Sequence, residues 1–221
     1  MSGTTRIDED AIAWSQPVGT RTGKPLVVFM HGFSGDEADW SAWFPTLPPG
    51  VVGAALRAPV PVGDRWAWVR LGQPGTSTSP LRSSYSAAAR GVSRWIDRQR
   101  VERVALVGWS QGGAMAVQLL RQQPGRFVST AVVAGFVANT APHAGVRARR
   151  PALWYGVGCR DDVIPPAMAT QSRRWLAEHT SATFVDFPDD GHLLSPALVN
   201  GAVDFTLAAL GHQQRGCLSG Y

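Results

Sequence analysis

The stretch Gly108-Trp109-Ser110-Gln111-Gly112 decides the fold, because it places a serine between a strand pattern and a helix pattern. Residues 104–107 form an apolar run typical of a buried strand, and residues 114–122 continue as a helix. A serine at the apex of such a sharp turn projects its hydroxyl clear of the backbone. The residues two positions to either side must then be small, and both are glycine. We therefore expect Ser110 to act as a nucleophile.

Outward from this turn, apolar runs of strand length alternate with longer segments of helical period. The runs that predict buried strands are residues 25–30, 51–56, 104–107, 130–134, 151–156 and 183–187. The segments that predict helices are residues 39–44, 85–99, 114–122, 167–179 and 196–210. Such alternation is typical of helices that cross over between parallel strands. The predicted fold class is α/β, with a mostly parallel central sheet, helices on both faces and no large lid domain.

The 221 residues are enough for one large core, and we expect a single domain over residues 1–211 followed by a flexible C-terminal tail over residues 212–221. Residues 57–80 read as a long loop. Cys159 and Cys217 are too few for a disulfide framework, which favours a reduced compartment. The N-terminus lacks a secretion signal and no apolar stretch is long enough for stable membrane insertion, so a cytoplasmic location is predicted.

The net charge of +5 and the pI of about 10.0 raise the question of nucleic-acid binding. The basic residues, however, are spread along the chain instead of forming one block. The densest group begins with Arg90, Arg94 and Arg98, whose spacing of four residues is typical of a solvated helix face. We expect no nucleic-acid partner.

A serine needs a base to take its proton, and the base needs a carboxylate to orient it. In the chain order serine, acid, histidine, the acid follows the predicted strand at 151–156 and the histidine follows the one at 183–187. His192 falls in the second position. Asp161 and Asp162 both fall in the first, and the residues alone do not separate them.

The other histidines fit the role of base less well. His31 lies at the end of a predicted strand, where a structural hydrogen bond is the commoner role. His143 lies in a polar loop, His179 closes a helix and His212 lies in the predicted tail, so we expect these three at the surface.

Two backbone N–H groups are candidates to hold the oxyanion that forms during attack on a carbonyl. Gln111 opens the helix after the nucleophile, and its N–H lies at the positive end of the helix dipole. Phe33 lies in the loop His31-Gly32-Phe33-Ser34-Gly35, which follows another predicted strand and whose glycines permit close backbone approach.

These motifs resemble those of the phospholipase/carboxylesterase family of the α/β-hydrolase superfamily, over nearly the whole chain. The similar segments are residues 31–40, Arg57-Ala58-Pro59 with residues 63–68, and residues 108–113. The family's acid lies in a Gly-x-x-Asp-x-Val-hydrophobic-Pro pattern, which aligns with residues 158–165 and implies that Asp161 is the acid. Val157 departs from the family, which commonly has histidine there; we expect this to alter packing more than chemistry.

The resemblance implies a serine carboxylesterase without metal or cofactor, acting on a small-molecule ester as a monomer or homodimer. The absence of a lid suggests small to medium acyl groups. Trp66, Trp68 and Trp109 are candidate pocket residues, although Trp66 and Trp68 are as readily read as a core aromatic pair. An acyl-protein thioesterase or lysophospholipase would use the same triad. A catalytically silent binding protein on this fold is a further alternative.

Overall fold

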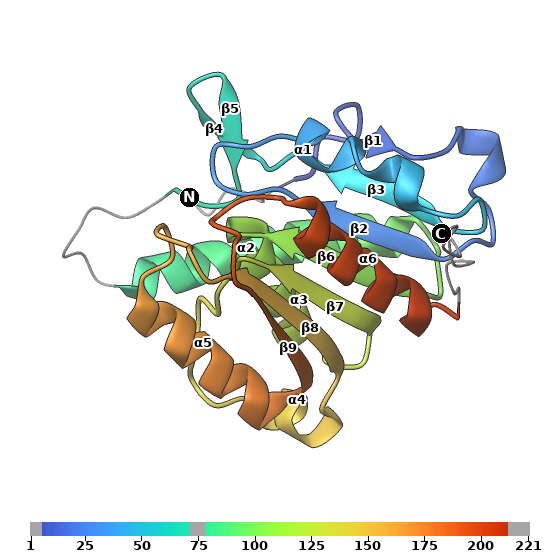
Figure 1. Ribbon diagram of the computed structural model, residues 1–221. Coiled ribbons are helices and arrows are strands. Elements are labelled where there is room, and N and C mark those ends of the chain that lie inside the picture. Colours follow the sequence, from blue (N-terminus) through green and yellow to red (C-terminus); the bar gives the residue numbers. More distant parts are fainter. Residues whose placement is uncertain (1–5, 71–77, 212–221) are drawn as a thin grey trace, which may run out of the picture.

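The computed structural model describes residues 6–70 and 78–211, with only the backbone of residues 78–81 (Figure 1). A seven-stranded sheet runs through the molecule in the order β1-β3-β2-β6-β7-β8-β9. Its strands are β1 (Ala13–Trp14), β2 (Leu26–Met30), β3 (Val52–Leu56), β6 (Val104–Trp109), β7 (Phe127–Val133), β8 (Ala152–Gly158) and β9 (Ser181–Phe187). Only β1 is antiparallel to its neighbour, so the predicted mostly parallel sheet is confirmed.

The central strands are apolar on both faces because helices cover both. In β2, Val28 and Met30 pack into one core cluster, whereas Val27 and Phe29 pack into another on the opposite face. This alternation follows from the two-residue period of a strand, which points successive side chains to opposite faces. The unbroken apolar run at residues 25–30 therefore corresponds to a strand buried between two helical layers.

Helices α2 (Thr78–Arg98) and α3 (Gln111–Gln122) cover one face of the sheet and α6 (Pro196–Ala209) covers the other (Figure 1). The short helix α1 (Ala38–Ser41) joins the α6 side through Trp40. Helices α4 (Ala144–Arg149) and α5 (Pro166–His179) complete the layer beyond α3. None of the helices in the described ranges is both long and apolar enough to cross a membrane.

Several elements differ from the sequence-based expectation. The segment predicted as a long loop contains a two-stranded hairpin of β4 (Val60–Val62) and β5 (Arg65–Ala67) and, from Thr78, the start of α2. The edge strand β1 and helix α4 were not predicted. The short strands of the hairpin include a proline and lack the alternation that identifies a strand. The predicted tail, residues 212–221, lies outside the described residues.

Candidate active site

Ser110 lies at a tight turn between β6 and α3, with φ 53° and ψ −114°. The two glycines of the motif make this turn possible. A Cβ atom on Gly108 would lie 2.1 Å from the carbonyl oxygen of Gly112, and one on Gly112 would lie 2.1 Å from that of Met30. The chain therefore passes so close to itself and to β2 that only glycine fits at both positions.

His192 lies in the loop between β9 and α6 and reaches the serine hydroxyl. Its Nε2 is 2.9 Å from Ser110 Oγ, and its Nδ1 is 2.8 Å from Asp161 Oδ2. Since an ionised carboxylate only accepts hydrogen bonds, Nδ1 donates to Asp161 and Nε2 is left to accept the serine proton. The side chains of His192 and Asp161 are each 10% exposed, which limits competition from water.

The carboxylate of Asp161 is held on both oxygens. Its Oδ1 accepts hydrogen bonds from the backbone N–H groups of Val163 and Ile164, each at 2.9 Å, while Oδ2 faces the imidazole. Asp162 is exposed, and the hydrogen bonds between described residues include none to its side chain. The structure thus brings Asp161, and not its neighbour, to His192.

The loops that carry Asp161 and His192 are packed against each other. A Cβ atom on Gly158, the last residue of β8, would lie 2.2 Å from the carbonyl oxygen of Asp190. The Arg160 N–H donates to that same oxygen at 2.9 Å. Because the two loops share this contact, the distance between acid and base is set by backbone packing.

The loop after β2 is anchored by buried aromatic residues. The indole N–H of Trp40 donates to Met30 O at 2.9 Å, and that of Trp68 donates to His31 O at 2.8 Å. His31 is fully buried, with Nδ1 2.7 Å from Gly32 O and Nε2 accepting from Ala58 N at 3.0 Å. Burial lowers the pKa of His31, so the residue is neutral and structural, as the sequence suggested.

The two expected oxyanion donors lie on the loop after β2 and at the start of α3. The backbone hydrogen bonds between described residues include none from the N–H of Phe33 or Gln111. The side chain of Gln111 has a role that sequence reasoning missed. Its Oε1 accepts a hydrogen bond from Trp68 N at 2.7 Å, and its Nε2 donates one to Val69 O at 2.9 Å. These bonds tie the segment after the hairpin to the turn at Ser110, the nucleophile elbow.

The three tryptophans predicted to line the pocket have different environments. Trp68 is 1% exposed and packs in the hydrophobic core, so it is a core aromatic residue and not a pocket residue. Trp66 is partly buried, with the Arg57 guanidinium 5.2 Å from its ring centre. Trp109 lies beside the base, its ring centre 5.8 Å from that of His192.

For two of the remaining histidines, His143 and His179, the expectation of a surface position is wrong. His179 is 2% exposed instead of lying at the surface, because it stacks on Trp175 at 4.2 Å and accepts from His143 N. His143 is partly buried and caps α4 by accepting from Val146 N. His212 lies outside the described residues. In the part of the chain that the structure describes, no cluster of His, Cys, Asp and Glu side chains is arranged to hold a metal ion.

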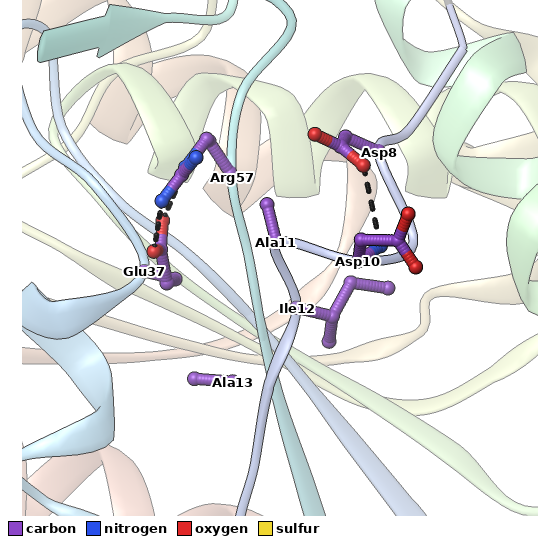
Figure 2. A pocket seen from close by; sticks show the side chains of 7 residues that line it. All are labelled: Asp8, Asp10, Ala11, Ile12, Ala13, Glu37 and Arg57. Atoms are coloured by element: carbon purple, nitrogen blue, oxygen red, sulfur yellow. Dashed lines mark hydrogen bonds and ion pairs between the residues drawn. The ribbon is translucent and has the colours of Figure 1, made fainter.

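Acidic residues that follow the loop at residues 31–35 pair with Arg57 and Arg65, which lie between β3 and the end of the hairpin. Figure 2 shows the Glu37 carboxylate against the Arg57 guanidinium, at the rim of a cavity of about 350 Å³. The pairing raises the pKa of Arg57. Arg65 binds Asp36 and lies 3.4 Å from Asp39. The contacts of Arg65, which lies in β5, fix the hairpin to the segment that follows Phe33.

A comparison with protein families agrees with this geometry. Residues 27–158 match the model described as the alpha/beta hydrolase family. The chain belongs to the alpha/beta hydrolase family. The matched region contains the loop after β2 and the elbow, and the fold around both is that of this family.

Individual relatives are distant. The chain is 29% identical over 178 residues to a putative carbamate hydrolase of Variovorax paradoxus, covering 76% of this chain and 62% of the relative. The matched segments cover 22% to 62% of the curated relatives' own lengths.

Several solved structures share the fold of this chain at low identity. A Bacillus cereus carboxylesterase superposes with a TM-score of 0.72 at 16% identity, over 90% of this chain and 93% of that one. Zea mays acyl-protein thioesterase 2 superposes with a TM-score of 0.69 at 19% identity, over 90% of this chain and 99% of that one.

Proposed function

We propose that this chain is a serine hydrolase that cleaves carboxylic esters through an acyl-enzyme on Ser110. The observation that carries the proposal is the chain of hydrogen bonds from Ser110 Oγ to His192 Nε2 at 2.9 Å and from His192 Nδ1 to Asp161 at 2.8 Å. A serine, a base and an orienting carboxylate in this order are the elements that nucleophilic acyl transfer requires.

In the proposed reaction, His192 takes the hydroxyl proton as Ser110 Oγ attacks the carbonyl carbon of the ester. The backbone N–H groups of Phe33 and Gln111 hold the oxyanion, and the positive end of the α3 dipole favours it. The intermediate collapses as His192 returns its proton to the leaving alkoxide, which departs as the alcohol. Water then attacks the acyl-enzyme by the same steps and releases the acid, with Asp161 stabilising the imidazolium each time.

The surroundings of the triad favour an apolar acyl or alcohol group. Three exposed large apolar side chains lie on the loops that carry the site: Phe33 after β2, Val163 after β8 and Leu193 next to His192. An apolar group that covers part of these side chains gains about 25 cal/mol for each Å² removed from water. We therefore propose apolar acyl chains as substrates, of small to medium length because the described residues include no large lid domain to cover a longer one.

A substrate panel tests this proposal. Nitrophenyl esters of two to twelve carbons, an acyl-thioester and a lysophospholipid are compared by kcat/KM with wild-type protein and the Ser110→Ala variant. We expect the largest value for an ester with a short or medium chain and its loss in the variant. A preference for the thioester or lysophospholipid would keep the triad but replace the ester assignment with a thioesterase or a lysophospholipase. Equal rates for wild type and variant would refute the serine mechanism.

A further inference from the structure

A large cavity lies at the opposite end of the sheet from the triad. Ser110, Asp161 and His192 follow the carboxyl ends of their strands, whereas this cavity lies where β2 and β3 begin and just before β6. A five-residue strand separates the two ends by about 17 Å. The cavity measures about 780 Å³, compared with about 350 and 360 Å³ for two others, and none of the three includes a triad residue.

Cations dominate the polar lining of this distal cavity. Arg21, Lys24, Arg100 and Arg103 line it, against a single carboxylate, that of Glu102. No described carboxylate forms an ion pair with any of the four. The cavity therefore has an excess positive charge without a partner in the described part of the chain.

Neutral groups hold three of the four cations in place. Arg21 Nε donates to Gln16 O at 2.8 Å, Lys24 Nζ donates to the side-chain oxygen of Gln16 at 2.6 Å, and Arg103 donates to Ala209 O at 3.4 Å. These contacts orient the head groups without neutralising them. Burial lowers the pKa of Arg21, an effect that a bound anion would oppose.

The rest of the lining is apolar. The Arg21 guanidinium lies 3.9 Å from the centre of the Trp14 ring, so a cation and an aromatic face occupy the same wall. Leu26 and Val52, both buried, and Val101 extend the apolar surface. A ligand that fits must offer negative charge to the cations and an apolar body to these side chains.

The smaller cavity of Figure 2 differs in the charge that it presents. It is lined by Asp8, Asp10 and Glu37, and its single cation, Arg57, is already paired with Glu37. Among the described residues that line it, it therefore offers no free cation to an anionic ligand. Asp8 in turn accepts a hydrogen bond from the Asp10 N–H.

We propose that the distal cavity binds an organic anion in which a carboxylate or phosphate head group is joined to an apolar body. The head group meets the cations, and the body lies against Trp14 and the apolar floor. Binding at this site is independent of the triad, since the two lie at opposite ends of the sheet.

Calorimetric titration of the full chain with octanoate, octyl phosphate, 1-octanol and inorganic phosphate, at fixed ionic strength, tests the site. At least one octyl anion should bind more tightly than octanol and than phosphate, and the two anions together tell which head group is preferred. In the double variant Arg21→Gln, Lys24→Gln we expect affinity to fall by about tenfold or more, since charge-assisted hydrogen bonds are lost. The variant's thermal midpoint is measured alongside to verify folding.

The matched control is Arg90→Gln, which removes an exposed arginine on α2 outside the cavity lining and should leave affinity unchanged. Anion binding of unchanged affinity in the double variant would place the ligand elsewhere, including at the triad, and would overturn the proposal. So would octanol binding as tightly as the octyl anions, or no binding of either anion at millimolar concentration.

Discussion

Ser110 has a positive φ of 53°, a conformation that residues with a side chain rarely adopt. Such strain persists only where the surroundings enforce it, and here Gly108 and Gly112 provide the close contacts that do so. The sharp turn at Ser110 could be predicted from the sequence because the requirement for small neighbours is local. The sequence could not by itself separate Asp161 from Asp162, because only the fold determines which carboxylate faces the base.

Substituting each of the two neighbouring aspartates by asparagine tests which of them orients His192. In Asp161→Asn the side chain no longer holds the productive tautomer of His192, and kcat for ester hydrolysis should fall by about 10⁴-fold, the loss known for this change in a serine-protease triad. Asp162→Asn is the matched control. Because Asp162 is exposed, this variant should keep kcat within about twofold of the wild-type value. Steady-state kinetics on one nitrophenyl ester provides both values, and a reversed order of the losses would contradict the assignment.

The buried His31 predicts a pH dependence of stability. Burial lowers the pKa of His31 in the folded chain, whereas in the unfolded chain it is about 6.5. The unfolded state therefore binds more protons as the pH falls through 6.5, so the stabilisation is present above that pH and is lost below it. In urea unfolding between pH 7.5 and 5.5, His31→Gln should lose less free energy of unfolding than wild type. Parallel losses would argue against a neutral buried histidine.

At the scale of elements, the site depends on how strand ends and loops are packed. The major strands and helices were predicted because each has a continuous apolar pattern. The β4–β5 hairpin and α4 were not, since three-residue strands and a six-residue helix carry too little periodicity and are fixed by contacts distant in sequence. The burial of His179 likewise depends on Trp175 and on His143 at the start of α4, and no local pattern indicates it.

Gly158 tests whether backbone contact between two loops sets the triad. In Gly158→Ala the new Cβ would meet Asp190 O at 2.2 Å, so the loops carrying Asp161 and His192 must separate. We expect kcat to fall by about 10²-fold, as for a displacement near 1 Å, and stability to fall by about 1–3 kcal/mol. Gly19→Ala is the control, because nothing lies within 4 Å of its Cβ position. Kinetics and chemical unfolding of both variants check this, and equal behaviour would refute it.

The Gln111 side chain offers a prediction about stability. In Gln111→Ala the buried Trp68 N–H and Val69 carbonyl lose their partner, and the free energy of unfolding should fall by about 1–3 kcal/mol. The control is Gln99→Ala. Within the described part of the chain, the amide of Gln99 donates to Trp95 O one turn earlier and to no other group, so its loss should cost less than about 1 kcal/mol. Urea titration gives both numbers. A loss for Gln111→Ala no larger than the control would show that the bridge is dispensable.

For the molecule as a whole, a parallel sheet brings together residues that are far apart in the chain. The loops after β2, β6, β8 and β9 meet at the carboxyl ends of the strands, which is why residues 31–35, Ser110, Asp161 and His192 converge. The order of the loops along the chain was enough to predict that Ser110, His192 and one of the two aspartates converge, but not which aspartate. The burial of Trp68, by contrast, follows from packing of the hairpin segment against His31, which the chain order does not reveal.

The distribution of charge leads to a prediction for the whole molecule. Despite the net charge of +5, several arginines are paired with carboxylates and those along α2 lie exposed on a solvated face. Nucleic-acid binding through phosphates needs a basic patch or stripe along a surface, whereas the four cations of the distal cavity gather in one hollow. In a gel-shift assay with duplex DNA at about 0.15 M salt, we expect no retardation. A shift that persists at that salt concentration would mean that the cations do form a binding surface.

The central claim is that Ser110 is a nucleophile activated by His192. Its most direct test is mass spectrometry of the intact and digested protein after reaction with a fluorophosphonate. One adduct should form in wild type and map to Ser110, labelling should be lost in Ser110→Ala, and it should be slowed by orders of magnitude in His192→Ala. An unlabelled wild-type protein, or an adduct on another residue, would contradict the claim.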